Sequence, residues 1–157
     1  MRLLAALACF TIAACSPQPA VNAGTVPELD GRFEFASLTV VNDSGEDIVF
    51  DVYLAESFEQ QRRGLMFIRD MPETTGMLFI YEDNAVRSIW MKNTYLPLDI
   101  VFARDDGSVA SIDANAAPLT LTSRSSGEPV RYVLELNAGT TRRMNIGRQS
   151  RLIWQPR

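Results

Sequence analysis

The sequence predicts a mostly β protein: a single antiparallel β-sandwich or barrel of jelly-roll-like type with one or two short helices. Eight short runs rich in β-branched and aromatic residues are separated by turn residues. Several of these runs place an apolar residue at every second position, as a strand with one buried face does. Only two short segments carry helix signals. The eight runs are Arg32–Val41, Ile48–Leu54, Met77–Tyr81, Val86–Met91, Leu98–Ala103, Ser108–Ala114, Val130–Leu136 and Arg151–Trp154.

Strand periodicity is clearest in two of the runs. Ile48, Phe50, Val52 and Leu54 recur at every second position of one run, and the run 98–103 repeats the same pattern. The turn 105–107 then reads Asp-Asp-Gly, whose glycine can adopt the positive φ of a tight hairpin. We therefore expect the runs 98–103 and 108–114 to pair as a hairpin.

The helix signals are short. Ser57 and Gln60 have the spacing of a capping box, and Gly64 offers a left-handed helix end. This pattern predicts about two turns of helix over Phe58–Arg63. A second helical turn is predicted over Thr140–Met144.

The N-terminus resembles the signal peptide of a bacterial lipoprotein. Arg2 precedes the apolar run Leu3–Ala14, and the segment 12–15 reads Ile-Ala-Ala-Cys, the pattern of a lipobox. A helix of twelve residues spans about 18 Å at about 1.5 Å per residue, which is too short for a bilayer core of about 30 Å. Removal of residues 1–14 would leave Cys15 as a lipid attachment site and a membrane anchor. The alternative is an ordinary signal peptide cleaved near Ala20 or Ala23.

Three regions follow from this interpretation. Residues 1–14 form the signal peptide, residues 15–30 a lipidated flexible tether, and residues 31–157 a single β domain. By resemblance to lipoproteins of Gram-negative bacteria, Ser16 after the cysteine favours the periplasmic face of the outer membrane. Within the domain, Ala114–Pro129 is predicted to be a polar loop, long enough for a lid.

Composition excludes several functional classes. The formal net charge is −4 and no basic cluster with interleaved aromatic residues is present, so nucleic acid is not an expected partner. The sequence has no histidine, and its only cysteines are Cys9 and Cys15, which removes Ser-His-Asp catalysis, a thiol nucleophile in the domain and the usual zinc ligands. We expect no cofactor and no metal site, and we assign the methionines to the core rather than to copper binding.

Several short motifs together resemble one protein family. The motifs are Arg63-Gly64-Leu65-Met66, Gly76-Met77-Leu78-Phe79, Trp90-Met91-Lys92-Asn93-Thr94, Pro97-Leu98-Asp99 and Tyr132-Val133-Leu134-Glu135-Leu136. Their order and spacing are similar to those of the family catalogued as domain of unknown function 192, from about Phe35 to the C-terminus. The resemblance implies a small, mostly β protein, often exported, without an established activity.

Four polar or aromatic residues of the 90–99 segment form a candidate ligand site. Strand alternation places Trp90 and Lys92 on one face, and the turn at Pro97 allows Asp99 to approach Lys92. In this interpretation Asn93 orients a ligand. In the structural alternative, which we favour, Asn93 and Asp99 hold a tight loop and the stem of Lys92 covers Trp90.

Arg63 and Glu135 complete the candidate site, each with two interpretations. Arg63 is either an anion contact or a cation placed favourably at a helix C-terminus. Glu135 alternates with the apolar residues of its run, which favours a solvated carboxylate. If the sheet closes around it, burial would raise its pKa and permit acid–base chemistry.

The sequence thus favours a lipid-anchored envelope protein that binds a small ligand or a partner protein without chemistry. The alternative is a carboxylate-dependent hydrolase of envelope glycans, which needs two acidic groups in one cleft. Asp99, Glu135 and Asp113 are the candidates for that pair.

Overall fold

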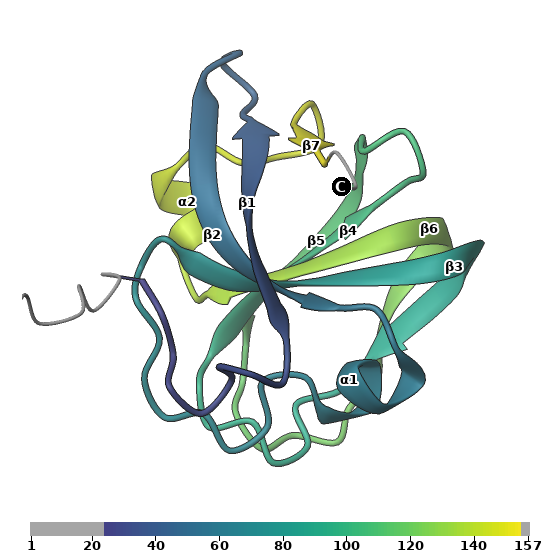
Figure 1. The fold of residues 1–157 in the computed structure, drawn as a ribbon. Helices are drawn as coiled ribbons and strands as arrows, with labels where there is room; N and C mark the ends of the chain where they lie inside the picture. Colours follow the sequence, from purple (N-terminus) through teal and green to yellow (C-terminus); the bar gives the residue numbers. More distant parts are fainter. Residues whose placement is uncertain (1–23, 155–157) are drawn as a thin grey trace, which may run out of the picture.

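The computed structural model describes residues 24–154 as one curled, seven-stranded sheet with two short helices (Figure 1). The predicted signal peptide and Cys15 lie outside the described residues. No helix among the described residues is long and apolar enough to cross a membrane. The elements are β1 (Glu34–Val41), β2 (Asp47–Ala55), α1 (Phe58–Arg63), β3 (Thr75–Ile89), β4 (Leu98–Ala103), β5 (Val109–Ala116), β6 (Arg124–Asn137), α2 (Thr140–Arg143) and β7 (Arg151–Ile153).

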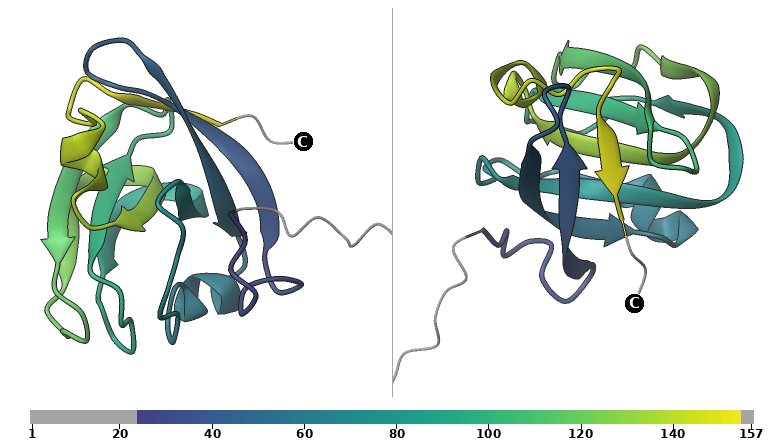
Figure 2. Two further views of the ribbon diagram at one scale, coloured as in Figure 1. Left: turned by 90° about the vertical axis from the view of Figure 1, so that its left-hand side faces the viewer. Right: turned by 90° about the horizontal axis from the view of Figure 1, so that it is seen from above.

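The strand order in the sheet is β5-β4-β6-β3-β2-β1-β7. Figure 2 shows how the sheet curls, with β1 and β2 on one side, β4 and β5 on the other, and α1 near one end of the space between them. The mostly β class with two short helices is confirmed.

One strand pair departs from the predicted antiparallel arrangement. β2 and β3 are parallel, with Tyr53 opposite Met77, and every other pair of named strands is antiparallel. Parallel neighbours need a crossover connection, and here the segment that carries α1 supplies it. The sheet is therefore mixed, and the crossover places α1 over one end of the sheet.

Strand boundaries differ from the prediction in two places. The predicted strands Met77–Tyr81 and Val86–Met91 belong to one long strand, β3, whose register against β6 shifts between Ile80 and Ala85. The predicted loop Ala114–Pro129 is mostly strand, because β5 continues to residue 116 and β6 begins at residue 124. Only residues 117–123 between these two strands remain a loop.

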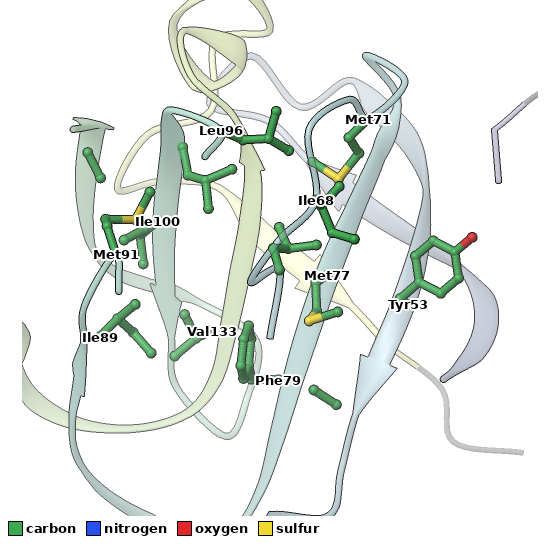
Figure 3. Packing of buried hydrophobic residues seen from close by; sticks show 14 of the residues in the cluster. Tyr53, Ile68, Met71, Met77, Phe79, Ile89, Met91, Leu96, Ile100 and Val133 are labelled. Atoms are coloured by element: carbon green, nitrogen blue, oxygen red, sulfur yellow. The ribbon is translucent and has the colours of Figure 1, made fainter. Parts of the chain in front are cut away.

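Both faces of the sheet are covered. Met77, Ile100 and Val133 belong to one buried cluster. Their sequence neighbours Leu78, Val101 and Leu134 point to the other face of the sheet and belong to a second cluster. Figure 3 shows Met71, Met77 and Met91 in the first cluster, as the assignment of methionine to the core predicts. Every residue of β4 is buried, so neither face of this strand meets solvent.

The packed structure begins before Gly31, where the sequence analysis placed the start of the domain. Val26 and Leu29 are buried in the first cluster. The hydroxyl of Tyr53 accepts a hydrogen bond from the Val26 amide at 2.6 Å and donates to Asp30 at 2.7 Å. The described part of the predicted tether, residues 24–30, is therefore attached to the sheet.

Candidate functional site

The helix α1 forms as its sequence predicts, and its end positions Arg63. Ser57 caps the amide of Gln60, and the Gln60 side chain accepts hydrogen bonds from the amides of Ser57 and Glu56, which completes the capping box. Gly64 ends the helix with φ of 46°. The Arg63 guanidinium then lies 4.8 Å from the centre of the Phe67 ring.

The connection between β3 and β4 forms the opposite wall of the site. Trp90 and Lys92 are exposed on the same side, as the alternation in the sequence predicts, although both lie just beyond the end of β3 at Ile89. The Lys92 ammonium lies 5.1 Å from the centre of the Trp90 ring. Asn93 turns the chain with a positive φ of 56°, and its carbonyl accepts the Phe67 amide at 2.8 Å. This hydrogen bond ties the connection to the segment that follows α1.

Two adjoining cavities lie between these walls and share Arg62, Arg63, Met66 and Trp90. We call them together the α1 groove. The inner cavity, of about 120 Å³, is also lined by Gln61, Gly64, Leu65, Phe79, Tyr81, Ser88, Ile89, Thr94 and Glu135. The outer cavity, of about 560 Å³, is also lined by Arg32, Glu59, Lys92 and Asn93.

Glu135 brings a buried carboxyl to the inner cavity. Its exposed fraction is 5%, and no described residue forms a hydrogen bond with its carboxyl group. Burial raises its pKa to about 8, so the group is protonated at neutral pH. The expectation of a solvated Glu135 was wrong, because both faces of β6 are buried: Val133 packs on one side and Leu134 on the other.

Tyr81 is a polar group of this cavity that the sequence analysis missed. The Arg87 guanidinium lies 4.0 Å from the centre of its ring. Burial, together with the nearby Glu135, raises the pKa of Tyr81 to about 12, against the smaller opposing effect of Arg87. The phenol therefore keeps its proton. The signal available in the sequence was the position of Tyr81 at the end of an apolar run, which is not specific.

Asp99 lies on the opposite face of the sheet and lines neither cavity. Its carboxylate accepts hydrogen bonds from the amides of Asn115, Gly139 and Thr141 at 2.9 to 3.0 Å and from the Thr141 hydroxyl at 2.7 Å. Burial opposes ionisation, but these donors together hold the pKa of Asp99 below its ordinary value. The functional interpretation, in which Asp99 pairs with Lys92, was therefore wrong.

The site thus gathers five of the six predicted residues: Arg63, Trp90, Lys92, Asn93 and Glu135. The structural interpretation holds for Asp99, which connects β4 to the end of β5 and to the start of α2. No group of three or more His, Cys, Asp or Glu side chains in residues 24–154 is arranged to hold a metal ion.

The geometry does not support a pair of catalytic carboxyls. Asp99 and Glu135 face opposite sides of the sheet, since Asp99 is aligned with Leu136 and Ile100 with Glu135. Asp113 forms an ion pair with Arg124 at 3.0 Å and lines neither cavity. Among the acidic residues that the structure describes, Glu135 alone lines the inner cavity.

Comparison with known proteins agrees with this fold. Residues 39–154 match the family DUF192, described as an uncharacterized ACR family. A Sinorhizobium meliloti 1021 crystal structure, provisionally named a transcription regulator, is 40% identical, with a TM-score of 0.76 over 77% of this chain and 94% of that one. A protein of unknown function from Novosphingobium aromaticivorans DSM 12444 is 33% identical, with a TM-score of 0.77 over 88% and 99% of the two chains. No curated protein matches the sequence. The chain therefore belongs to the DUF192 family.

Proposed function

We propose that this protein is a lipid-anchored envelope protein that binds a small ligand in the α1 groove and carries out no chemistry on it. The observation that carries the proposal is Glu135, a buried carboxyl without a hydrogen-bond partner among the described residues, at a cavity lined by apolar and polar side chains in similar numbers. Small-molecule sites combine apolar walls with polar groups that orient the ligand. A carboxyl at a cavity whose hydrogen-bonding capacity the protein does not use is open to a ligand, which favours a role in binding.

The alternative of a glycan hydrolase has less support. It requires two carboxyl groups about 5 Å or about 6.5 to 9.5 Å apart around the scissile bond. Asp99 is held on the other face of the sheet, and Asp113 is neutralised by Arg124.

The lipid anchor at Cys15 and the placement at the periplasmic face of the outer membrane belong to the proposal and rest on the sequence of residues 1–16. Eight residues lie between Cys15 and Gly24, so the nine steps along the chain reach at most about 32 Å at about 3.6 Å per step. The β domain would therefore stay close to the membrane surface. The intact mass of the mature protein tests the anchor: an acylated Cys15 is expected, whereas a retained leader or an unmodified cysteine contradicts it.

Ligand binding is tested with a cavity-filling variant. We expect at least one compound from a panel of envelope sugars, peptidoglycan fragments and small organic anions to raise the melting temperature of the protein. Ser88→Phe should abolish this shift, because Ser88 lines the inner cavity. Ser125→Phe is the matched control, since Ser125 is aligned with Ser88 across the sheet and lines neither cavity. Shifts that survive Ser88→Phe would contradict binding in the α1 groove.

A further inference from the structure

The outer cavity concentrates positive charge on an acidic protein. Arg32, Arg62, Arg63 and Lys92 line it against one acidic residue, Glu59, while the chain as a whole carries a formal charge of −4. A cavity lined by one sign of charge raises the local concentration of ions of the opposite sign. The charge of the outer cavity therefore opposes that of the whole molecule and favours anions.

Three of these cations have no carboxylate partner. Arg62 forms an ion pair with Glu59 at 3.1 Å, whereas Arg32, Arg63 and Lys92 form none with any residue in the described range 24–154. The Nε atom of Arg63 is buried and has no hydrogen-bond acceptor. Guanidinium groups bind carboxylate and phosphate with two parallel hydrogen bonds, so Arg63 has unused capacity for an oxyanion.

The inner cavity complements this positive charge with neutral donors. The Glu135 carboxyl is protonated at neutral pH and the Tyr81 phenol keeps its proton, so each can donate a hydrogen bond without repelling an anion. Phe79, Leu65 and the other apolar lining residues surround them. A ligand that spans both cavities would therefore place its charge in the outer one and an uncharged polar group in the inner one.

Strained backbone lies beside the groove, at residues that hydrogen-bond to its lining residues Asn93 and Thr94. Phe67 and Leu119 adopt positive φ values of 70° and 60°, which bulky side chains rarely take. The Phe67 amide donates to the Asn93 carbonyl, and the Leu119 amide donates to the Thr94 carbonyl at 3.1 Å. Strained backbone of this kind persists where surrounding structure holds it, and it is frequent at binding sites.

From these observations we infer that the ligand of the α1 groove carries an oxyanion, a phosphate or a carboxylate, which Arg63 and Lys92 bind in the outer cavity. This inference rests on the proposed function and specifies the chemical class of the ligand. Either a soluble metabolite or a lipid headgroup at the membrane surface could supply the oxyanion.

Trp90 provides a direct measurement, because it lies between the two cavities and the chain has only one other tryptophan, Trp154. The full chain carrying Trp154→Phe reports Trp90 fluorescence alone. It is titrated at constant ionic strength with inorganic phosphate, with acetate and with the neutral sugar N-acetylglucosamine. Vesicles of phosphatidylglycerol and of phosphatidylcholine are added to the same chain with Cys15→Ser, which removes any acyl anchor.

We expect Trp90 fluorescence to change with at least one soluble anion or with the phosphatidylglycerol vesicles, and not with phosphatidylcholine. Arg63→Gln should weaken that response by about tenfold or more, since a charge-assisted hydrogen bond is lost. Arg131→Gln is the matched control, because Arg131 also has a buried Nε without an acceptor but lines neither cavity. Response to a soluble anion identifies a free ligand, and response to anionic vesicles alone identifies a headgroup.

The pH dependence separates the role of Glu135 from that of the cations. The charged or titratable groups that line the inner cavity with it are Tyr81 from β3 and Arg62 and Arg63 from α1, with Arg87 packed on Tyr81. Tyr81, with its pKa raised to about 12, stays neutral between pH 6 and pH 9. Sulfate keeps a constant charge in this range, so its affinity should fall above about pH 8 as Glu135 ionises. Glu135→Gln should remove that decline.

Three outcomes would overturn the inference in distinguishable ways. If only the neutral sugar changes Trp90 fluorescence, the groove binds a ligand but not an oxyanion, and the proposed function stands without this extension. If anions act equally on the Arg63→Gln variant, they bind elsewhere and the assigned site is wrong. Absence of any anion response contradicts the inference outright.

Discussion

Asp99 and Glu135 are two buried carboxyl groups on neighbouring strands that have opposite chemical environments. They lie one register position apart on β4 and β6, yet they face opposite sides of the sheet. Asp99 accepts four hydrogen bonds, which hold its pKa below the ordinary value although burial opposes ionisation. Glu135 has no such donors among the described residues, and burial alone raises its pKa to about 8.

The difference distinguishes a structural carboxylate from an available one. Asp99 joins β4 to Asn115 near the end of β5, and to Gly139 and Thr141 at the start of α2, so its capacity for hydrogen bonds is used inside the protein. Glu135 keeps its capacity for a ligand at the inner cavity. Burial alone therefore does not identify a functional carboxyl, and its hydrogen-bond partners decide between the two roles.

The largest expected effect is the loss of the Asp99 hydrogen bonds. Asp99→Ala leaves three amides and one hydroxyl without their acceptor, and it should lower the free energy of unfolding by about 3 to 5 kcal/mol. Urea denaturation at pH 7 measures this quantity. Asp47→Ala, at an exposed position, is the control. A loss below about 1 kcal/mol would show that Asp99 is not a structural carboxylate.

Glu135→Gln should change stability in the opposite direction. At pH 7 the folded protein must keep a proton that the unfolded chain, with a pKa near 4.5, has released. Glutamine has no such requirement, so the free energy of unfolding of the variant at pH 7 should be higher by about 3 kcal/mol. This figure follows from about 1.4 kcal/mol for each pH unit between the pKa of the unfolded chain and pH 7. At pH 4 the gain should vanish, which provides an internal control. Destabilisation at pH 7 would indicate that Glu135 is ionised in the folded state.

The wild-type protein should therefore have its maximum stability at mildly acidic pH. The raised pKa of Glu135 lowers the free energy of unfolding as pH rises from about 4.5 to about 8, because the folded state binds a proton that the unfolded state does not. The lowered pKa of Asp99 acts at lower pH, where its protonation removes stability. Between pH 5 and pH 7 we expect a decline of about 2 to 3 kcal/mol. A profile that is flat over this range in urea denaturation would contradict the assignment.

Arg63→Gln should have the smallest effect on stability. Its guanidinium contacts the Phe67 ring but has no ion-pair partner among the described residues, so we expect a change below about 1 kcal/mol in the free energy of unfolding. Arg124→Gln, which breaks the ion pair with Asp113, is the comparison and should lower the free energy of unfolding more than Arg63→Gln does. Equal losses would indicate that Arg63 stabilises the fold rather than serving the groove.

Local signals predicted local structure well. The capping box of Ser57 and Gln60 placed α1 at the residues where the structure has it, and the alternation of Trp90 and Lys92 placed both on one side. The long strand β3 was divided in two because its middle, around Asp83, is exposed and polar although it continues the sheet.

Long-range features could not be read from the sequence. The parallel pairing of β2 and β3 depends on the path of the crossover, and the burial of Glu135 depends on packing against both faces of β6. Asp99 finds its donors at residues up to 42 positions away. Alternation within one strand reports the environment of a side chain only when one face of the sheet meets solvent.

The central claim is that the buried Glu135 carboxyl is protonated at neutral pH, and a measurement of its protonation state tests this claim most directly. The carboxyl carbon chemical shift of Glu135, followed by NMR in the full chain from pH 4 to pH 10 and assigned by its loss in Glu135→Gln, reports this state alone. The structure predicts a titration midpoint near 8. A midpoint near the ordinary glutamate value of about 4.3 would show an ionised carboxylate at neutral pH and would contradict the account of the α1 groove.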